Sequence, residues 1–162
     1  MKINDQELTE EQTNKLKECL PELFPSKYKP KHGEEYCYVS NSGRVFYKKW
    51  SNEDTIGNDI FSIGNVFSTK EEAEEEIKYR KALTTIKHYI LDNFGEWKPD
   101  WEDEGQSKYF IYYDHTDKRF DYNGSYFFQE IMPSFLYLQS DGQCEQLIKD
   151  CETELKIVCG VE

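Results

Sequence analysis

The stretch from Gly64 to Gly95 reads GNVFSTKEEAEEEIKYRKALTTIKHYILDNFG and contains the strongest helix signals in the chain. Thr69 and Glu72 form a capping-box pattern, in which a hydroxyl and a carboxylate bind the free amides of a first helical turn. Apolar residues then recur at steps of three and four on one helix face, namely Leu83, Ile86, Ile90 and Phe94. Gly95 stands where a glycine can take the left-handed conformation that ends a helix. The sequence predicts a short strand that leads into a long, partly buried helix.

A weaker copy of this pattern returns 71 residues later, near the C-terminus. The aligned segments are Tyr137-Leu138-Gln139-Ser140 with Val66-Phe67-Ser68-Thr69, and Cys144, Ile148 and Lys149 with Ala73, Ile77 and Lys78. The fixed offset indicates a duplication, and chance similarity between two amphipathic segments is the alternative. We expect an α+β fold in which two repeated units of antiparallel strands are each followed by a helix, with an extra N-terminal helix.

The chain divides by this pattern into an N-terminal helix and linker over residues 1–27, a first β-β-β-α unit over residues 28–95 and a second over residues 96–162. One compact globule would hold all three. The N-terminal helix is expected over Asp5 to Phe24. Its end is set by Pro25, which a helix cannot continue past. In the first unit, strands at residues 35–40 and 44–49 would form a hairpin around Asn41-Ser42-Gly43. A polar loop at residues 51–59 and a third strand at residues 60–67 would follow.

The second unit is expected to repeat this order. Strands at residues 108–113 and 119–122 would be joined by a turn at residues 115–118. Asn123-Gly124 would make another turn before an aromatic strand at residues 125–132. A final helix at residues 141–158 would place Cys144, Ile148, Cys151 and Leu155 on one face.

The composition limits the function. The chain has 162 residues, with 20 basic and 32 acidic side chains and a net charge of -12. Such a surface repels phosphate backbones, so direct nucleic-acid binding is not expected and basic partners are favoured. Five cysteines without a Cys-x-x-Cys pair indicate reduced thiols. With no signal peptide and no run of 18 apolar residues, we expect a cytoplasmic protein without membrane contact.

The first candidate contact surface is the acidic run that opens the long helix: Glu71, Glu72, Glu74, Glu75 and Glu76. Negative charge in a first helical turn is favourable in itself, so a solvated acidic face is the simpler interpretation. Five carboxylates over about 7.5 Å of helix nevertheless approach the charge density of duplex DNA, about one charge per 1.7 Å. The run is therefore a candidate for occupying a basic nucleic-acid-binding groove.

The second candidate surface combines acidic and aromatic residues, in the loop Asp100, Trp101, Glu102, Asp103 and Glu104 and at Trp50. Loops carry function often, and Trp is enriched where interfaces are strongest. The alternative is that the indoles of Trp50, Trp97 and Trp101 only hold the units together.

We expect no enzyme, no catalytic residues, no cofactor and no metal. His32, His88 and His115 lack zinc-binding spacing, and no nucleophile elbow, phosphate loop or dinucleotide motif is present. Asp114, His115 and Asp117 could hold a metal for hydrolysis, but a charged hairpin turn explains them equally well. The cysteines on helix and strand patterns are explained by burial.

The segments KPKHGEEYCYVSNSGRV, GNVFSTKEEAEEEI and WKPDW resemble a group of small uncharacterised proteins encoded by phages and prophages of Gram-positive bacteria. The similarity covers about Lys29 to Trp101 and is clearest at Gly64 to Ala73. It implies an accessory protein of a mobile element and brings no known activity or catalytic residues. Anti-CRISPR proteins and other inhibitors of host defence recur among small acidic phage proteins, which is an analogy of class.

Two functions follow as hypotheses. The first is a non-enzymatic inhibitor that covers a basic, nucleic-acid-binding surface of a host defence protein, with a CRISPR-associated nuclease as a candidate partner and the bacterial cytosol as its location. The second is a small-ligand binder that sequesters a signalling nucleotide between the two repeats, which would need basic groups such as Lys29 with Lys31 or Arg80 with Lys81. Repeat symmetry also leaves a homodimer open.

Overall fold

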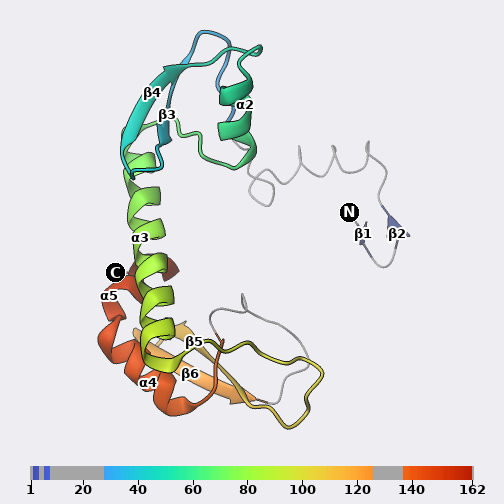
Figure 1. Cartoon of the computed structure of the whole chain (residues 1–162), viewed down its shortest axis with the longest axis vertical. Coiled ribbons are helices and arrows are strands. Elements are labelled where there is room, and N and C mark those ends of the chain that lie inside the picture. The colour runs from blue at the N-terminus through green and yellow to red at the C-terminus, as the bar shows by residue number, and fades with distance from the viewer. Residues whose placement is uncertain (1, 4–5, 8–27, 126–136, 162) are drawn as a thin grey trace. The chain divides into compact units, whose positions relative to one another are not determined.

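The computed structural model describes residues 2–3, 6–7, 28–125 and 137–161, and its fold is α+β as expected (Figure 1). The strands are β1 (Lys2–Ile3), β2 (Gln6–Glu7), β3 (Glu35–Val39), β4 (Val45–Lys49), β5 (Lys108–Asp114), β6 (Arg119–Ser125) and β7 (Tyr137–Leu138). The helices in the described residues are α2 (Thr55–Ser62), α3 (Lys70–Phe94), α4 (Asp141–Asp150) and α5 (Glu152–Cys159). Two compact units, Met1–Ala73 and Glu74–Glu162, divide the chain inside α3.

The N-terminal helix expected over Asp5 to Phe24 lies mostly outside the described residues. Gln6 and Glu7 are an exception, because they pair with Lys2 and Ile3 as two short antiparallel strands. The start of the predicted helix is therefore wrong at these two residues.

Unit 1 is built on the predicted hairpin of β3 and β4. Tyr38 pairs with Phe46 and Cys37 with Tyr47, and the turn lies at residues 41–43. On the other side of β3, Phe67 forms an antiparallel bridge with Cys37, with N–H to O distances of 3.0 and 2.9 Å. The hairpin thus gains a third short strand segment immediately before α3.

The strand predicted at residues 60–67 is wrong, as is much of the loop predicted before it. Helix α2 runs through Ser62. Of residues 60–67, only Phe67 pairs with a strand, through its isolated bridge to Cys37. The competing helical spacing of Ile56, Ile60 and Ile63 prevails, because α2 can pack Gly57 and Phe61 inward.

The core of unit 1 consists of Tyr36, Trp50 and Val66. The Trp50 ring makes edge-to-face contacts with Tyr36 at 5.7 Å and with Phe61 of α2 at 5.8 Å between ring centroids. Gly57 is buried where α2 meets the hairpin, and a Cβ there would lie 2.9 Å from the Asp54 carboxylate and 3.4 Å from the Tyr36 hydroxyl. The close packing of α2 therefore depends on a missing side chain.

Helix α3 begins and ends as the sequence predicts. The Thr69 hydroxyl accepts the Glu72 N–H at 3.2 Å, and the Glu72 carboxylate accepts the Thr69 N–H at 3.4 Å and the Ser68 N–H at 2.9 Å. Gly95 has a φ of 78° and its N–H donates to the Leu91 carbonyl, which ends the helix in the left-handed region.

The sheet of unit 2 has the order β6-β5-β7, with all pairs antiparallel. The β5–β6 hairpin matches the prediction, but the predicted turn at Asn123-Gly124 is wrong, because both residues continue β6. Gly124 is opposite Tyr109, whose ring atom Cε1 would lie 2.2 Å from a Cβ at that position. The glycine makes room for this ring, and most of the strand predicted at residues 125–132 lies outside the described residues.

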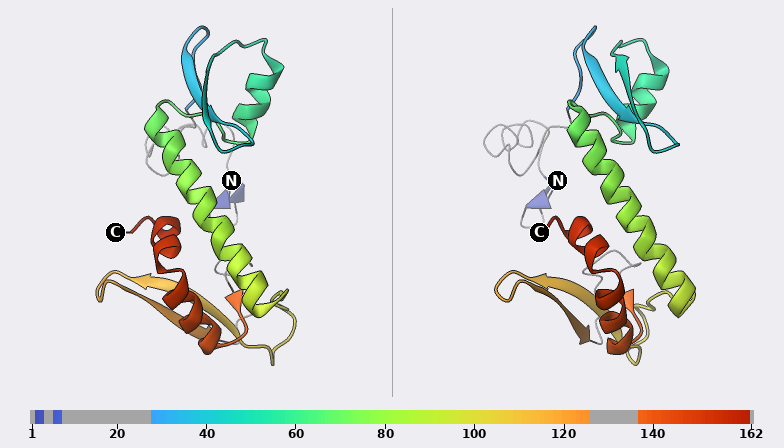
Figure 2. Two further views of the ribbon diagram at one scale, coloured as in Figure 1. Left: turned by 60° about the vertical axis from the view of Figure 1, so that its left-hand side comes forward. Right: turned by 90° about the vertical axis from the view of Figure 1, so that its left-hand side faces the viewer.

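Helix α4 lies against the β5–β6 hairpin, and α5 continues from it (Figure 2). They replace the single helix predicted at residues 141–158, because the backbone of Cys151 leaves helical geometry at φ -126° and ψ 27°. The sequence has no proline or glycine that explains this break. The core of unit 2 is larger than that of unit 1 and contains Ile86, Phe120, Leu138, Cys144, Leu147, Cys151 and Leu155.

The two units repeat the same local plan. In unit 2, β5 pairs on one side with its hairpin partner and on the other with β7, as β3 does with β4 and Phe67. The Ser140 hydroxyl then accepts the Gln143 N–H at 3.3 Å, and the Gln143 amide oxygen accepts the Gln139 N–H at 2.8 Å. This is the arrangement of Thr69, Glu72 and Ser68 at the predicted offset.

Candidate protein-interaction surface

The acidic start of α3 is mostly solvent-exposed. Glu71, Glu74 and Glu75 are exposed and stand three and four residues apart, so they share one side of the helix. Their charges also face the positive end of the helix dipole, which favours them at this place. These three residues, the acidic face of α3, present negative charge to the solvent.

The other two residues of the predicted acidic run have local roles. Glu72 binds Ser68 and Thr69 in the helix cap, and hydrogen bonds from the Ser68 hydroxyl and amide lower the pKa of its carboxyl. Glu76 accepts a hydrogen bond from the Arg80 guanidinium at 2.7 Å. Their charges contribute to the field of the helix start together with those of the acidic face.

An exposed aromatic side chain lies on the hairpin that precedes this acidic turn in the chain. Tyr47 of β4 is 54% exposed and pairs with Cys37 of β3, so the two side chains are on the same face of the hairpin. Burial raises the pKa of the Cys37 thiol, and the negative charges of Glu35, Glu71 and Glu72 raise it further. The charges of Glu71 and Glu72 thus act on Cys37, the strand partner of Tyr47.

Trp50, a predicted contact residue, is instead in the core. Its side chain is 1% exposed, and its indole N–H donates to the Asn52 side chain at 3.1 Å. The Lys29 ammonium lies 5.8 Å from the ring centroid. Trp50 is therefore not available to a partner in this fold, and the prediction for this residue is corrected.

The acidic loop of unit 2 is ordered by its own carboxylates. Asp100 accepts the Glu102 N–H at 2.9 Å, and Asp103 accepts the Gly105 N–H at 2.8 Å. The Asp100 N–H donates to the Gln106 side chain at 2.6 Å. Glu102 and Glu104 are exposed, so this loop also presents charge to the solvent.

A buried lysine supports this loop from inside. The Lys108 side chain is 1% exposed, and its ammonium donates to the carbonyls of Asp103 at 3.2 Å and Gln106 at 3.0 Å. It also lies 5.5 Å from the ring centroid of Trp101, which packs edge-on against Tyr137 at 5.0 Å. Trp101 is thus half-buried and forms part of the loop's support.

Within unit 2, Glu74 and Glu75 are separated from the acidic loop by most of the length of α3. From Glu76 to Phe94 the helix rises by about 27 Å, and the loop with Asp100 to Glu104 follows its C-terminal end. A partner that contacts both regions would need a long binding surface.

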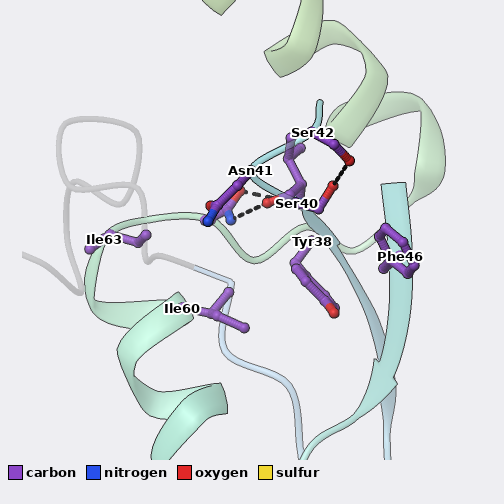
Figure 3. A pocket seen from close by; sticks show the side chains of 9 residues that line it. Tyr38, Ser40, Asn41, Ser42, Phe46, Ile60 and Ile63 are labelled. Atoms are coloured by element: carbon purple, nitrogen blue, oxygen red, sulfur yellow. Dashed lines mark hydrogen bonds between the residues drawn. The ribbon is translucent and has the colours of Figure 1, made fainter. Parts of the chain in front are cut away.

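A groove lies beside the hairpin of unit 1, between it and α2, with a cavity volume of about 530 Å³ (Figure 3). We call it the α2 groove; its lining residues are Tyr38, Val39, Ser40, Asn41, Ser42, Phe46, Ile60, Ile63 and Asn65. The aromatic rings of Tyr38 and Phe46 stack at 5.9 Å along one wall, and Ile60 and Ile63 come from the other. No lining residue is charged, so this groove offers no cation for a phosphate.

The residues considered for metal binding form a hairpin turn. The Asp114 carboxylate accepts the N–H groups of Asp117 at 3.2 Å and Thr116 at 2.7 Å, and these bonds lower its pKa. His115 packs edge-on against Tyr113. Within the described ranges, no three His, Cys, Asp or Glu side chains are grouped closely enough to hold a metal ion.

The described thiols are mostly protected. Cys37, Cys144 and Cys151 are buried, and Cys159 is exposed. Burial raises the pKa of Cys144 to about 12, so this thiol stays protonated at neutral pH. Such a group is a poor nucleophile.

The sequence interpretation missed the most exposed apolar residues of unit 1: Phe46, Tyr47, Ile56 and Ile63. A signal for the first two was present. Val45, Phe46 and Tyr47 are consecutive in a strand, and a strand turns successive side chains to opposite faces, so one face cannot bury all three.

The chain matches no family model, no curated protein and no solved structure. The resemblance to small phage proteins therefore stays a prediction. Among the helices of the described residues, none is both long enough and apolar enough to span a membrane.

Proposed function

We propose that this protein is a non-enzymatic inhibitor that covers a basic, nucleic-acid-binding surface of a host defence protein. Its partner would be a basic bacterial protein, with a CRISPR-associated nuclease as the leading candidate, and it would act in the cytosol of the infected bacterium. The observation that carries this proposal is the acidic face of α3 on a chain whose net charge is -12.

The spacing of these carboxylates supports electrostatic mimicry. Glu71, Glu74 and Glu75 lie within about 6 Å along the helix axis and are exposed on one side. A basic groove that binds phosphates would attract such a row of charges, and the long-range field of the whole chain would speed the encounter.

An exposed ring beside the charges would add short-range affinity. Tyr is enriched at interface hot spots because a rigid ring fills a pocket with little loss of conformational entropy. Tyr47 meets this requirement through its exposure, and its strand partner Cys37 is within the field of Glu71, whereas the buried Trp50 does not. We therefore place Tyr47 in the contact surface, and keep the loop with Asp100, Trp101 and Glu104 as a second contact region.

The test uses purified bacterial nucleic-acid-binding defence proteins, including CRISPR-associated nucleases, and measures how strongly the chain displaces labelled DNA or RNA from each. The triple variant Glu71→Gln, Glu74→Gln, Glu75→Gln removes three charges from the acidic face. With an inhibited target in hand, we expect association at low salt to slow about tenfold, because steering by charge is weakened.

The matched control removes three exposed charges elsewhere, through Asp92→Asn, Glu96→Gln and Asp117→Asn. It has the same net charge as the test variant and should retain most of the association rate. Equal losses in both variants would assign the effect to net charge alone. Failure to displace nucleic acid from any member of the panel would reject the inhibitor function.

Ionic strength and small ligands provide independent tests. Raising the salt concentration should weaken inhibition, because it screens charges separated by more than about 8–10 Å. Calorimetry with a panel of signalling nucleotides should show no heat of binding, because the α2 groove has no charged lining residue. Tight nucleotide binding by the chain alone would favour the sequestering function instead.

A further inference from the structure

Helix α2 has an apolar stripe on its solvent side. Ile56, Ile60 and Ile63 are spaced by four and three residues, so they lie along one side of the helix. Ile56 is 62% exposed and Ile63 is 73% exposed, the largest values among the exposed large apolar side chains of the described residues. Gly57 is buried and both Phe61 and Ile60 pack against the core, so the exposed Ile56 and Ile63 are additional to what the core needs.

This stripe borders the α2 groove. Ile60 and Ile63 form one wall, and Phe46, which is 46% exposed, stands on the hairpin wall opposite (Figure 3). An apolar projection and an apolar recess are thus present side by side on the same surface. Contiguous exposed apolar surface of this kind marks an interaction site more often than single exposed residues do.

Two exposed residues of opposite charge adjoin residues that line the two walls of the groove, and we call these two positions its rims. Asp59 is exposed and lies beside Ile56 and Ile63 on the surface of α2, three and four residues away. Arg44 is exposed at the end of the hairpin turn, where its N–H donates to the Ser40 hydroxyl that lines the groove. A partner that presents the same pair of rims in reverse order would match both charges.

We propose that a second copy of this chain occupies the α2 groove, in a two-fold symmetric dimer. Ile63 of each copy inserts between the α2 wall and the Phe46 wall of the other. A two-fold axis exchanges the rims, so that Asp59 of each copy faces Arg44 of the other. The Ile63 projection, the α2 groove that receives it and the Asp59–Arg44 pair then each occur twice in the interface, as a two-fold symmetric interface requires.

The net charge of the chain sets the conditions for this association. Two bodies of charge -12 repel each other at long range. Salt screens that repulsion, while the apolar contact at short range is preserved. Dimerisation should therefore strengthen as salt is added, opposite to the salt dependence expected for inhibition.

Analytical ultracentrifugation of the full chain, over a range of protein concentrations at moderate salt, tests the dimer directly. We expect the mass to rise from 19.3 kDa toward twice that value. Ile63→Asp should reduce the association constant at least tenfold, because it places a charge in the apolar recess of both copies. The matched control Leu91→Asp, at a residue 54% exposed on α3, should leave the association constant unchanged.

Charge reversal tests the two-fold geometry. Asp59→Arg and Arg44→Asp should each weaken the dimer, because each places like charges together at two symmetric positions, and the double variant should restore it. A mass of 19.3 kDa at near-millimolar concentration, where a dissociation constant of about 1 mM would be visible, would overturn the dimer. A dimer insensitive to Ile63→Asp would overturn the groove as its interface, and a double variant that stays weak would overturn the exchanged rims.

Discussion

The two units follow one plan but differ in where their apolar residues lie. In unit 2, Phe120 of β6, Leu147 of α4 and Leu155 of α5 are buried together in one core. In unit 1, α2 leaves Ile56 and Ile63 exposed. The shared plan needs only a hairpin, a bridging segment and a capped helix. Helix α2 is an addition to that plan, so its exposed side chains are not required by the repeated scaffold.

The comparison also separates two kinds of tryptophan. Trp50→Ala should destabilise unit 1 by about 3–5 kcal/mol, because it leaves a cavity between Tyr36 and Phe61. Trp101→Ala in unit 2 should cost clearly less, since that ring is half-buried. Urea unfolding followed by circular dichroism measures both. Equal losses would show that the indoles do not divide into a core and a surface class.

The two units differ in the residue that stands just before the central-strand position paired with Phe67 or with Leu138: it is neutral in unit 1 and positively charged in unit 2. Tyr36 precedes Cys37 in unit 1, and Lys108 precedes Tyr109 in unit 2. Lys108→Met keeps the chain volume but removes the hydrogen bonds to the Asp103 and Gln106 carbonyls, so we expect a loss of about 1.5–3 kcal/mol.

Hydrogen exchange should locate this loss. The amides of the loop around Asp103 should exchange faster in Lys108→Met, while those of β3 and β4 should not. The control Lys98→Met, at an exposed lysine of the same loop, should change neither the stability nor the exchange. Unchanged exchange in the loop would contradict the supporting role of Lys108.

If the two units are equivalent in stability as well as in geometry, removing the N-cap hydroxyl of α3 or of α4 should lower the free energy of unfolding by the same amount. Thr69→Ala and Ser140→Ala each remove a hydroxyl that accepts a helix N–H, and each should cost about 1 kcal/mol. Thr85→Ala, at an exposed position inside α3, is the control and should change stability little. A large loss at one cap only would break the equivalence of the two units.

The smallest expected effect concerns pH. The cap of α3 uses Glu72, whose pKa the hydrogen bonds from Ser68 hold below its ordinary value in the folded chain, whereas the cap of α4 uses the neutral Gln143. A lowered pKa stabilises the fold above the unfolded-state pKa, and this contribution is lost as pH falls through the folded-state value. Unfolding of Glu72→Gln should therefore depend less on pH between about pH 5 and pH 3 than that of the natural chain. Gln143→Glu should introduce the same dependence in unit 2, and its absence would count against this account.

The sequence was most informative where a local pattern has one physical solution. Thr69 with Glu72, Gly95 and the offset that aligns Ser140 with Thr69 all predicted contacts that the structure contains. Each of these depends on residues within one turn of the chain. The α+β class followed from them directly.

The errors arose where nearby patterns competed or where packing decided the outcome. Ile60 to Phe67 fits both strand and helix spacing, and burial of Phe61 beside Trp50 selects the helix. Gly124 has the composition of a turn, but the ring of Tyr109 needs its space. Burial of Trp50 was not predictable either, because sequence spacing does not show which rings meet in a core.

Gly57 protects an ion pair to which it does not itself belong. It lies where α2 contacts the hairpin, and an added methyl group would meet the Asp54 carboxylate at 2.9 Å. That carboxylate, at the N-cap of α2, pairs with the Lys48 ammonium of β4 at 2.5 Å. Alanine at position 57 would therefore displace the Asp54 side chain and disturb the charge pair that ties the start of α2 to the hairpin.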